Sequence, residues 1–262
     1  MTANGAAARS GPISGSVASV IVLGVIPARL RSTRLPRKPL REIAGVPMVV
    51  HVFRRACRAP VLSDLLVATD SDEIVEACHA HHVPAVMTRP DHPSGTDRLW
   101  EVSRARAADV YVNIQGDYPT ITPGHIERLV RPFLNEPEVQ VTTLKIRATR
   151  EEVESPTVNK VVTNVHGDAL YFSHLPIPFD RDSRGGVIYW KHIGLYAYRR
   201  PVLDTFHSLP PSSLERAEQL EQLRLLEAGI PIHVLETHEP IIGVDTEEDL
   251  RAVEAQLSSR PR

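Results

Sequence analysis

Cysteine is scarce in this chain: the 262 residues contain only Cys57 and Cys78, too few for a disulfide framework. No apolar run approaches the length of a membrane span. Residues 1–19 are rich in Ala, Gly and Ser but lack the basic start and apolar core of a signal peptide. We therefore predict a disordered tail over 1–19 and a cytoplasmic location.

An excess of charge of one sign is also missing. The formal net charge of −2 favours neither nucleic acid nor a membrane surface as a partner. Two common nucleotide-binding signatures, the Walker A loop and a Gly-x-Gly-x-x-Gly turn opening a helix, are absent from the sequence. No Ser-His-Asp or Cys-His pattern stands out, and Cys78 with His82 has no second ligand pair for a metal.

The first half of the chain alternates apolar runs with amphipathic stretches. This alternation predicts an α/β protein with a doubly wound, mostly parallel sheet. The expected strands are Val20–Ile26, Leu65–Thr69, Ala85–Met87 and Val110–Ile114. The expected helices are Met48–Arg58, Asp72–His82, Asp97–Ala107 and Pro123–Leu134.

The middle of the chain is richer in strand patterns. We expect residues 20–258 to form one domain in which roughly 139–212 make a smaller β-rich lid or dimerisation lobe. Its expected strands are Val139–Ile146, Asn159–Thr163, Leu170–Ser173 and Ile193–Arg199, with a loop over Pro176–Gly186. A helix over Leu214–Leu226, a strand over Ile232–Leu235 and a helix over Thr246–Leu257 follow.

A basic loop follows the first strand. Its five cations, stiffened by three prolines, are Arg29, Arg31, Arg34, Arg37 and Lys38. A loop at the carboxyl end of a strand lies where α/β sheets bind ligands, and forked Arg donors with a Lys point charge suit a polyphosphate. A solvated basic loop or a nucleic-acid patch is the alternative interpretation.

A second signal is Val-Asn-Ile-Gln-Gly-Asp over 112–117, in which a strand ends in a Gly turn that delivers Asp117. A carboxylate there faces the basic loop and could hold Mg²⁺, which prefers one or two carboxylates plus phosphates and water. Alternatively, Asp117 only caps the turn.

Two motifs together resemble a known family. Residues 28–40 resemble the signature Ala-Arg-x-x-Ser-Thr-Arg-Leu-Pro-x-Lys-Pro-Leu of the CMP-Kdo synthetases (3-deoxy-manno-octulosonate cytidylyltransferases), and residues 243–250 resemble their second metal motif. The resemblance covers residues 20–258. It implies a nucleotide-diphospho-sugar-transferase-like fold, a homodimer, CTP as substrate and Mg²⁺ on Asp117 and Asp245. The alternative for Asp245 is a helix N-cap.

The resemblance also assigns roles to individual residues. Those expected to act in catalysis are Arg29, Arg34, Lys38 and Asp117. Those expected to bind the nucleotide are Ala28, Arg29, Thr69, Asp70, Ser94, Gly95, Thr96, Arg98 and Gln115. Those expected to bind a small acidic acceptor are Tyr118, Lys160, His192, Tyr196, Glu221 and Gln222. For the last two, a solvated helix face is the alternative.

The sequence departs from the family beside Asp117. Tyr118 stands where the family usually has Glu, and Thr120 replaces an apolar residue. We expect the Tyr118 ring to border the space beyond the metal and to reduce the acceptor pocket. This slightly favours a phosphonate such as phosphonoformate over the sugar acid Kdo as acceptor. A protein that binds CTP without turnover is a second hypothesis.

Overall fold

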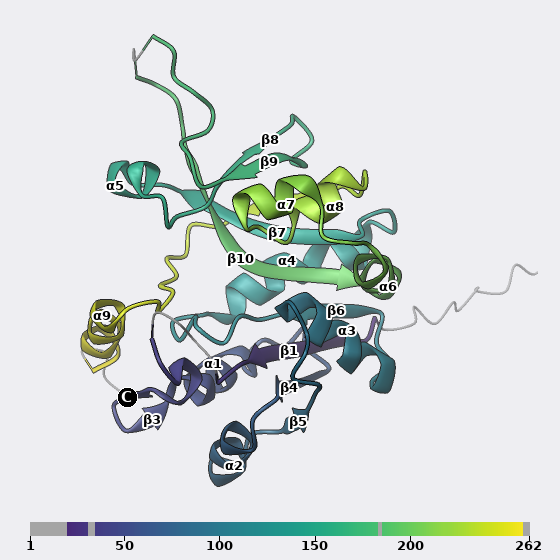
Figure 1. Ribbon diagram of the computed structural model, residues 1–262, viewed down its shortest axis with the longest axis vertical. Coiled ribbons are helices and arrows are strands. Elements are labelled where there is room, and N and C mark those ends of the chain that lie inside the picture. Colours follow the sequence, from purple (N-terminus) through teal and green to yellow (C-terminus); the bar gives the residue numbers. More distant parts are fainter. Residues whose placement is uncertain (1–19, 31–34, 183–184, 259–262) are drawn as a thin grey trace, which may run out of the picture.

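The computed structural model describes residues 20–30, 35–182 and 185–258 (Figure 1). Its main sheet is built, in chain order, from β1 (Val22–Ala28), β4 (Asp64–Thr69), β5 (Ala85–Met87), β6 (Val110–Asn113), β7 (Val141–Arg147), β10 (Trp190–Arg199) and β11 (His233–Glu236). The spatial order is β11-β7-β10-β6-β1-β4-β5. On this path β10 alone is antiparallel to its neighbours, so the predicted α/β class with a mostly parallel sheet is confirmed.

Helices cover both faces of this sheet. One face carries α1 (Met48–Ala56), α2 (Asp72–Ala80) and α4 (Pro123–Asn135). The other carries α3 (Gly95–Ala105), α6 (Arg200–Ser208) and the short α8 (Leu223–Glu227). The alternation of β1 accounts for both layers, because Val22 and Ile26 enter the first core while Leu23 and Val25 enter the second.

Smaller elements surround the sheet. After β1 come the 3₁₀ helix η1 (Lys38–Leu40) and the hairpin of β2 (Glu42–Ile43) and β3 (Val46–Pro47). Helix α5 (Arg150–Glu154) and the pair β8 (Lys160–Thr163) and β9 (Ala169–Ser173) follow β7. Helix α7 (Ser213–Glu218) precedes α8, and α9 (Glu247–Ser258) closes the described chain. None of the helices in these ranges is both long enough and apolar enough to cross a bilayer.

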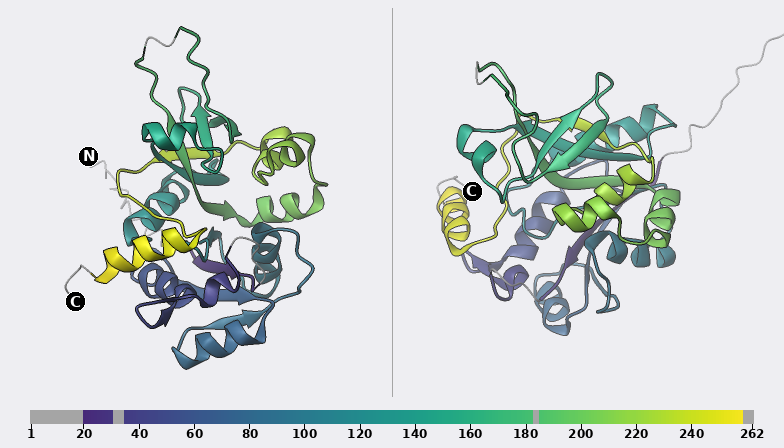
Figure 2. Two further views of the ribbon diagram at one scale, coloured as in Figure 1. Left: turned by 60° about the vertical axis from the view of Figure 1, so that its left-hand side comes forward. Right: turned by 45° about the horizontal axis from the view of Figure 1, so that its top comes forward.

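The strand-rich middle of the chain divides between the sheet and a projection. Strands β7 and β10 lie on the main path of the sheet. Strands β8 and β9 belong to the same sheet but branch off this path, since β8 pairs with β9 and meets β10 at its start. Residues 174–182 and 185–189, between β9 and β10, extend away from the body of the protein, as the left view in Figure 2 shows. Helix α9 packs elsewhere, in a separate apolar cluster with Ile43 and Met48.

The prediction of one continuous helix over 214–226 is wrong, because the structure has two short helices there. Gln219 adopts a left-handed conformation with φ of 56°, which ends α7 and separates it from α8. A left-handed residue cannot continue a right-handed helix, so the chain turns here. Helix α6 was not predicted, although Pro201 lies in its first turn.

The fold predicts a contrast between two leucines. Leu144 of β7 is fully buried between β10 and β11, whereas Leu170 of β9 is 62% exposed. Leu144→Ala should lower the free energy of unfolding by about 2–5 kcal/mol, because it leaves a cavity in a packed core. Leu170→Ala should change it by no more than about 0.5 kcal/mol. Urea unfolding of both variants measures this, and equal losses would contradict the central position of β7.

Candidate active site

A cavity of about 760 Å³ opens where β1 and β6 end, at the edge of the sheet where α/β proteins bind ligands. Three parts of the chain form its lining: the residues that follow these strands, the start of α3, and the region of α7 and α8. The predicted site residues that line it are Ala28, Arg29, Lys38, Ser94, Gly95, Gln115, Asp117, Glu221 and Asp245. Among lining residues that the sequence analysis did not assign to the site are Arg216 and Gln219.

Lys38 lies between two carboxylates in the cavity wall. Its Nζ donates to Oδ2 of Asp117 at 2.7 Å and to Oδ1 of Asp245 at 2.8 Å. Burial alone would lower the pKa of Lys38, but the charges and hydrogen bonds of the two aspartates outweigh it and raise the pKa. The lysine therefore stays cationic, and the three predicted groups are brought together.

Local geometry explains how the two aspartates meet. Gly116 passes close to β1, since a Cβ there would lie 3.2 Å from the carbonyl oxygen of Pro27. The backbone N–H of Val244 donates to the carbonyl of Asp117 at 2.9 Å, so the segment before α9 runs beside the turn after β6. Asp249, and not Asp245, accepts from the backbone N–H groups of 245 and 246. The carboxylate of Asp245 accepts from Lys38 in the cavity wall.

The basic loop contributes Arg29, whose Nη2 is buried without a hydrogen-bond partner among the described residues. Asn113 at the end of β6 has both side-chain polar atoms in the same condition, and its Nδ2 would lie 3.8 Å from a Cβ on Gly95. Buried hydrogen-bonding groups without a protein partner, next to a cavity, are suited to binding a polar ligand. The sequence analysis did not assign Asn113 to the site, although a polar amide side chain within an apolar strand could have indicated a functional residue. Arg34, predicted to be catalytic, lies outside the described residues.

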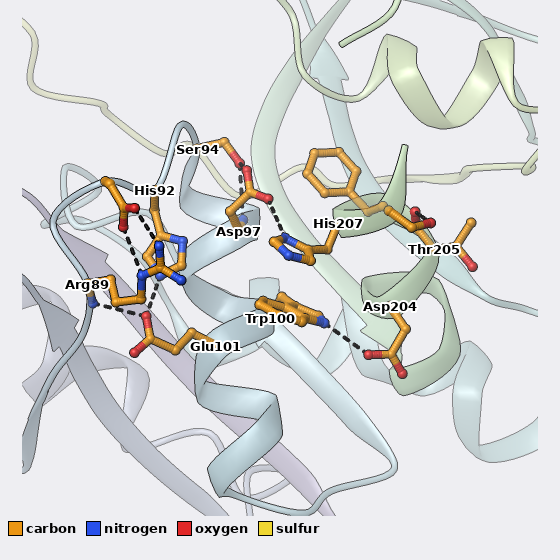
Figure 3. A network of polar contacts seen from close by, with 12 residues as sticks. Arg89, His92, Ser94, Asp97, Trp100, Glu101, Asp204, Thr205 and His207 are labelled. Atoms are coloured by element: carbon orange, nitrogen blue, oxygen red, sulfur yellow. Dashed lines mark hydrogen bonds and ion pairs between the residues drawn. The ribbon is translucent and has the colours of Figure 1, made fainter. Parts of the chain in front are cut away.

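The start of α3 is fixed by a polar network (Figure 3). The Ser94 hydroxyl donates to Oδ2 of Asp97 at 2.7 Å and accepts from its backbone N–H. Oδ1 of Asp97 lies 3.1 Å from Nδ1 of His207 in α6, and the His207 ring stacks on Trp100. These contacts hold Ser94 and Gly95 against the cavity.

The opposite wall is tied to the same helix. Thr96 donates its hydroxyl to Oε1 of Glu221 at 2.8 Å, across 125 residues of sequence. Burial is the main cause of the raised pKa of Glu221, partly opposed by the hydroxyls of Thr96 and Ser94. Arg224 binds both carboxylate oxygens of Glu215, which fixes α7 to α8. Thr96, assigned to the nucleotide, and Glu221, assigned to the acceptor, therefore form one unit.

Several predicted nucleotide residues lie behind the cavity. Arg98 is fully buried, with Nη1 bonded to Thr88 and Nη2 3.3 Å from Oδ2 of Asp70. Thr69, at the end of β4, is also fully buried. Neither these residues nor Thr96 are among those that line the cavity.

The predicted role of Lys160 as an acceptor-binding residue is wrong in this structure. Its side chain is fully buried, and Nζ donates to the backbone carbonyls of Ser155, Val158 and His174. An ammonium group has three donors, so none remains for a ligand. Lys160 instead holds the turn before β8 against the end of β9.

Three further predicted acceptor residues also lie outside the cavity lining, whereas Glu221 is part of it. His192 Nε2 lies 3.0 Å from the Thr143 hydroxyl, inside the sheet. Tyr196 and Gln222 are buried and do not line the cavity, although the Tyr196 hydroxyl and Gln222 Nε2 lack hydrogen-bond partners among the described residues.

The expected position of the Tyr118 ring is corrected by the structure. The ring does not line the cavity and packs against the core beneath it. Its hydroxyl accepts from the backbone N–H of Gly194 at 3.3 Å, and its Cε1 would lie 3.1 Å from a Cβ on Gly243. The two glycines leave the space that the aromatic ring fills. Tyr118 therefore does not reduce the acceptor pocket.

Comparison with known proteins defines the class. The cytidylyltransferase family matches residues 23–236, and the chain belongs to it. Within that class it is a member of the CMP-Kdo synthetase family. It is 54% identical to 3-deoxy-manno-octulosonate cytidylyltransferase of Acidobacterium capsulatum over 94% of this chain and 100% of that protein. The Escherichia coli protein of the same name is 46% identical over 89% of this chain and 95% of its own length.

Solved structures agree. A CMP:2-keto-3-deoxy-manno-octonic acid synthetase complexed with CTP superposes with a TM-score of 0.87 at 45% identity, covering 91% of this chain and 98% of that one. A cytidylyltransferase from Leptospira borgpetersenii, at 16% identity and a TM-score of 0.62, shares the fold. The protein is thus a cytidylyltransferase. The relatives at 45–54% identity carry the sugar-acid name and give no support to the slight preference for a phosphonate.

The environment of His192 predicts a pH effect on stability. Burial lowers the pKa of His192 to about 3, so the folded protein keeps this ring neutral where an unfolded chain gains a proton. The free energy of unfolding should fall as the pH drops from about 6.5 towards 3, by about 1.4 kcal/mol per pH unit from this residue. His192→Gln should flatten the dependence by that amount. Urea unfolding between about pH 7.5 and 5.5 measures it, and parallel curves would refute the assignment.

Proposed function

We propose that this protein transfers CMP from CTP to 3-deoxy-manno-octulosonate (Kdo), releasing pyrophosphate. The observation that carries the proposal is the placement of Lys38, Asp117 and Asp245 together in the cavity wall. The identity of about half with Kdo cytidylyltransferases over nearly the full chain supports Kdo as the acceptor.

The proposed reaction is an in-line displacement. The oxygen of the anomeric hydroxyl of Kdo forms a bond to the α-phosphorus of CTP, and the hydroxyl proton passes to solvent water. The bond from the α-phosphorus to the oxygen that bridges to the β-phosphate breaks, and pyrophosphate leaves. Lys38 and Arg29 neutralise the charge that develops on the leaving group, so positioning and charge stabilisation supply the catalysis without a covalent intermediate.

The residues present fit a magnesium ion. Asp117 and Asp245 offer oxygen ligands with side chains 34% and 42% exposed, and a cationic group already lies between them. Within the described ranges no three His, Cys, Asp or Glu residues gather as a complete metal site. Two carboxylates completed by substrate phosphates and water are the arrangement that Mg²⁺ prefers. When bound, Mg²⁺ would supply charge stabilisation to the phosphate oxygens.

The rest of the cavity wall has polar groups suited to the two substrates. Arg29 and Gln115 lie near the ends of β1 and β6, and Ser94 and Gly95 present the start of α3. Glu221 and Arg216 stand on the side formed by α7 and α8, where we place the hydroxyl-rich acceptor. A homodimer remains a prediction.

Removing either carboxylate charge tests the metal role. Asp117→Asn and Asp245→Asn should each lower kcat/KM by about 100-fold or more, because a ligand for the cation is lost. Asp168→Asn is the matched control, since its side chain is equally exposed at 34% and pairs with His233 away from the cavity. Pyrophosphate release from CTP and Kdo is the measurement. Near-normal rates in both site variants would contradict the assignment.

The acceptor is tested directly by a substrate panel. Wild-type protein with CTP and Mg²⁺ should release pyrophosphate when Kdo is added, and much less with phosphonoformate or methylphosphonate. Phosphonate turnover without Kdo turnover would overturn the proposed acceptor. Binding of CTP by calorimetry with no turnover on any acceptor would instead support the hypothesis of a nucleotide-binding protein without catalysis.

A further inference from the structure

Asp245 lies at the end of a segment that has no regular backbone ladder to hold it. Between β11 and α9, residues 237–246 form neither helix nor strand. The position of the Asp245 carboxylate beside Asp117 must therefore come from other contacts. The question is which side chains provide them.

The hydroxyl of Thr120 supplies one such contact. Its Oγ1 accepts from the backbone N–H of Ile242 at 2.8 Å and donates to the carbonyl oxygen of the same residue at 3.4 Å. One hydroxyl thus meets both polar groups of a backbone unit that no strand partner satisfies. Thr120 is 6% exposed, so these hydrogen bonds are largely shielded from water.

Two further contacts act on the same segment. The Val244 N–H donates to the Asp117 carbonyl at 2.9 Å, and the Tyr118 ring lies against Gly243 between these two attachment points. The Tyr118 hydroxyl in turn accepts from Gly194 of β10. We call Tyr118 and Thr120, with their contacts to residues 242 and 243, the 118–120 brace.

We propose that Thr120 is a positioning residue for Asp245 and thereby sets the affinity of the site for a divalent cation. The inference rests on the proposed function, since it assigns the two aspartates to a cation. Thr120 does not line the cavity, so it would act through the backbone of Ile242, three residues before Asp245. Groups that orient metal ligands commonly change metal affinity by 10–100-fold when removed.

Both distinctive residues after Asp117 then have a role. Tyr118 and Thr120 flank Pro119, and their side chains reach neighbouring positions, Gly243 and Ile242, on the same segment. The departure from the family pattern therefore lies in how the second aspartate is held, and not in the acceptor pocket.

The experiment compares Thr120→Val, Thr120→Ser and Thr142→Val. Valine keeps the shape of threonine but loses the hydroxyl, whereas serine keeps the hydroxyl. Thr142 in β7 is the matched control, because its buried hydroxyl also donates to a backbone carbonyl, that of Leu129, away from the cavity. Free Mn²⁺, followed by electron paramagnetic resonance, gives the cation affinity of each protein in complex with CTP. The Mg²⁺ concentration that gives half-maximal turnover is the second readout.

Thr120→Val should raise the Mn²⁺ dissociation constant and the half-saturating Mg²⁺ concentration by about tenfold. Its kcat should largely recover at saturating Mg²⁺, and Thr120→Ser should restore the wild-type affinity. Thr142→Val should lower the melting temperature without changing cation affinity. Wild-type affinity in Thr120→Val, or an equal loss in Thr142→Val, would overturn the proposal.

The two proposals fail differently. If wild-type protein forms no CMP-Kdo, the proposed function fails, whereas the Mn²⁺ titrations still report on the brace. If wild-type protein is active and Thr120→Val binds Mn²⁺ normally, only the role of Thr120 fails.

Discussion

The ammonium group of Lys38 joins three segments that are far apart in the sequence, since it binds Asp117 and Asp245 across 79 and 207 residues. Two carboxylates in one cavity wall repel each other, and the lysine between them removes that cost. Because the carboxylates are partly exposed, the contribution of these ion pairs to folding is modest. Their importance is local. In the proposed reaction, substrate phosphates would replace the carboxylates as partners of the ammonium group, and a divalent cation would replace the ammonium group as the partner of the carboxylates.

Features with a local cause could be predicted from the sequence. Apolar runs such as Val22–Ile26 cannot remain in water, and their alternation with amphipathic stretches leads to a layered α/β sheet. The turn at Gly116 and the loop around Lys38 likewise follow from nearby residues, so the meeting of Lys38 with Asp117 at one sheet edge was foreseeable.

Features that depend on distant partners could not be predicted. The left-handed conformation of Gln219 interrupts a segment whose sequence pattern is otherwise helical. The turn brings Glu221 to Thr96, a contact 125 residues apart that the local sequence does not reveal. The sequence alone suggests that Lys160 is a ligand-binding cation. Only the structure shows that its ammonium group donates to three backbone carbonyls. The Tyr118 ring turns to the core because two glycines, at 194 and 243, leave room there.

The antiparallel direction of β10 has a consequence for where the chain can change in length. Since β10 is antiparallel to β6, it begins near the sheet edge at which β1 and β6 end, and the projecting segment after β9 leads directly into it. Because that segment lies outside the sheet, a change in its length would leave the register of the parallel strands unchanged.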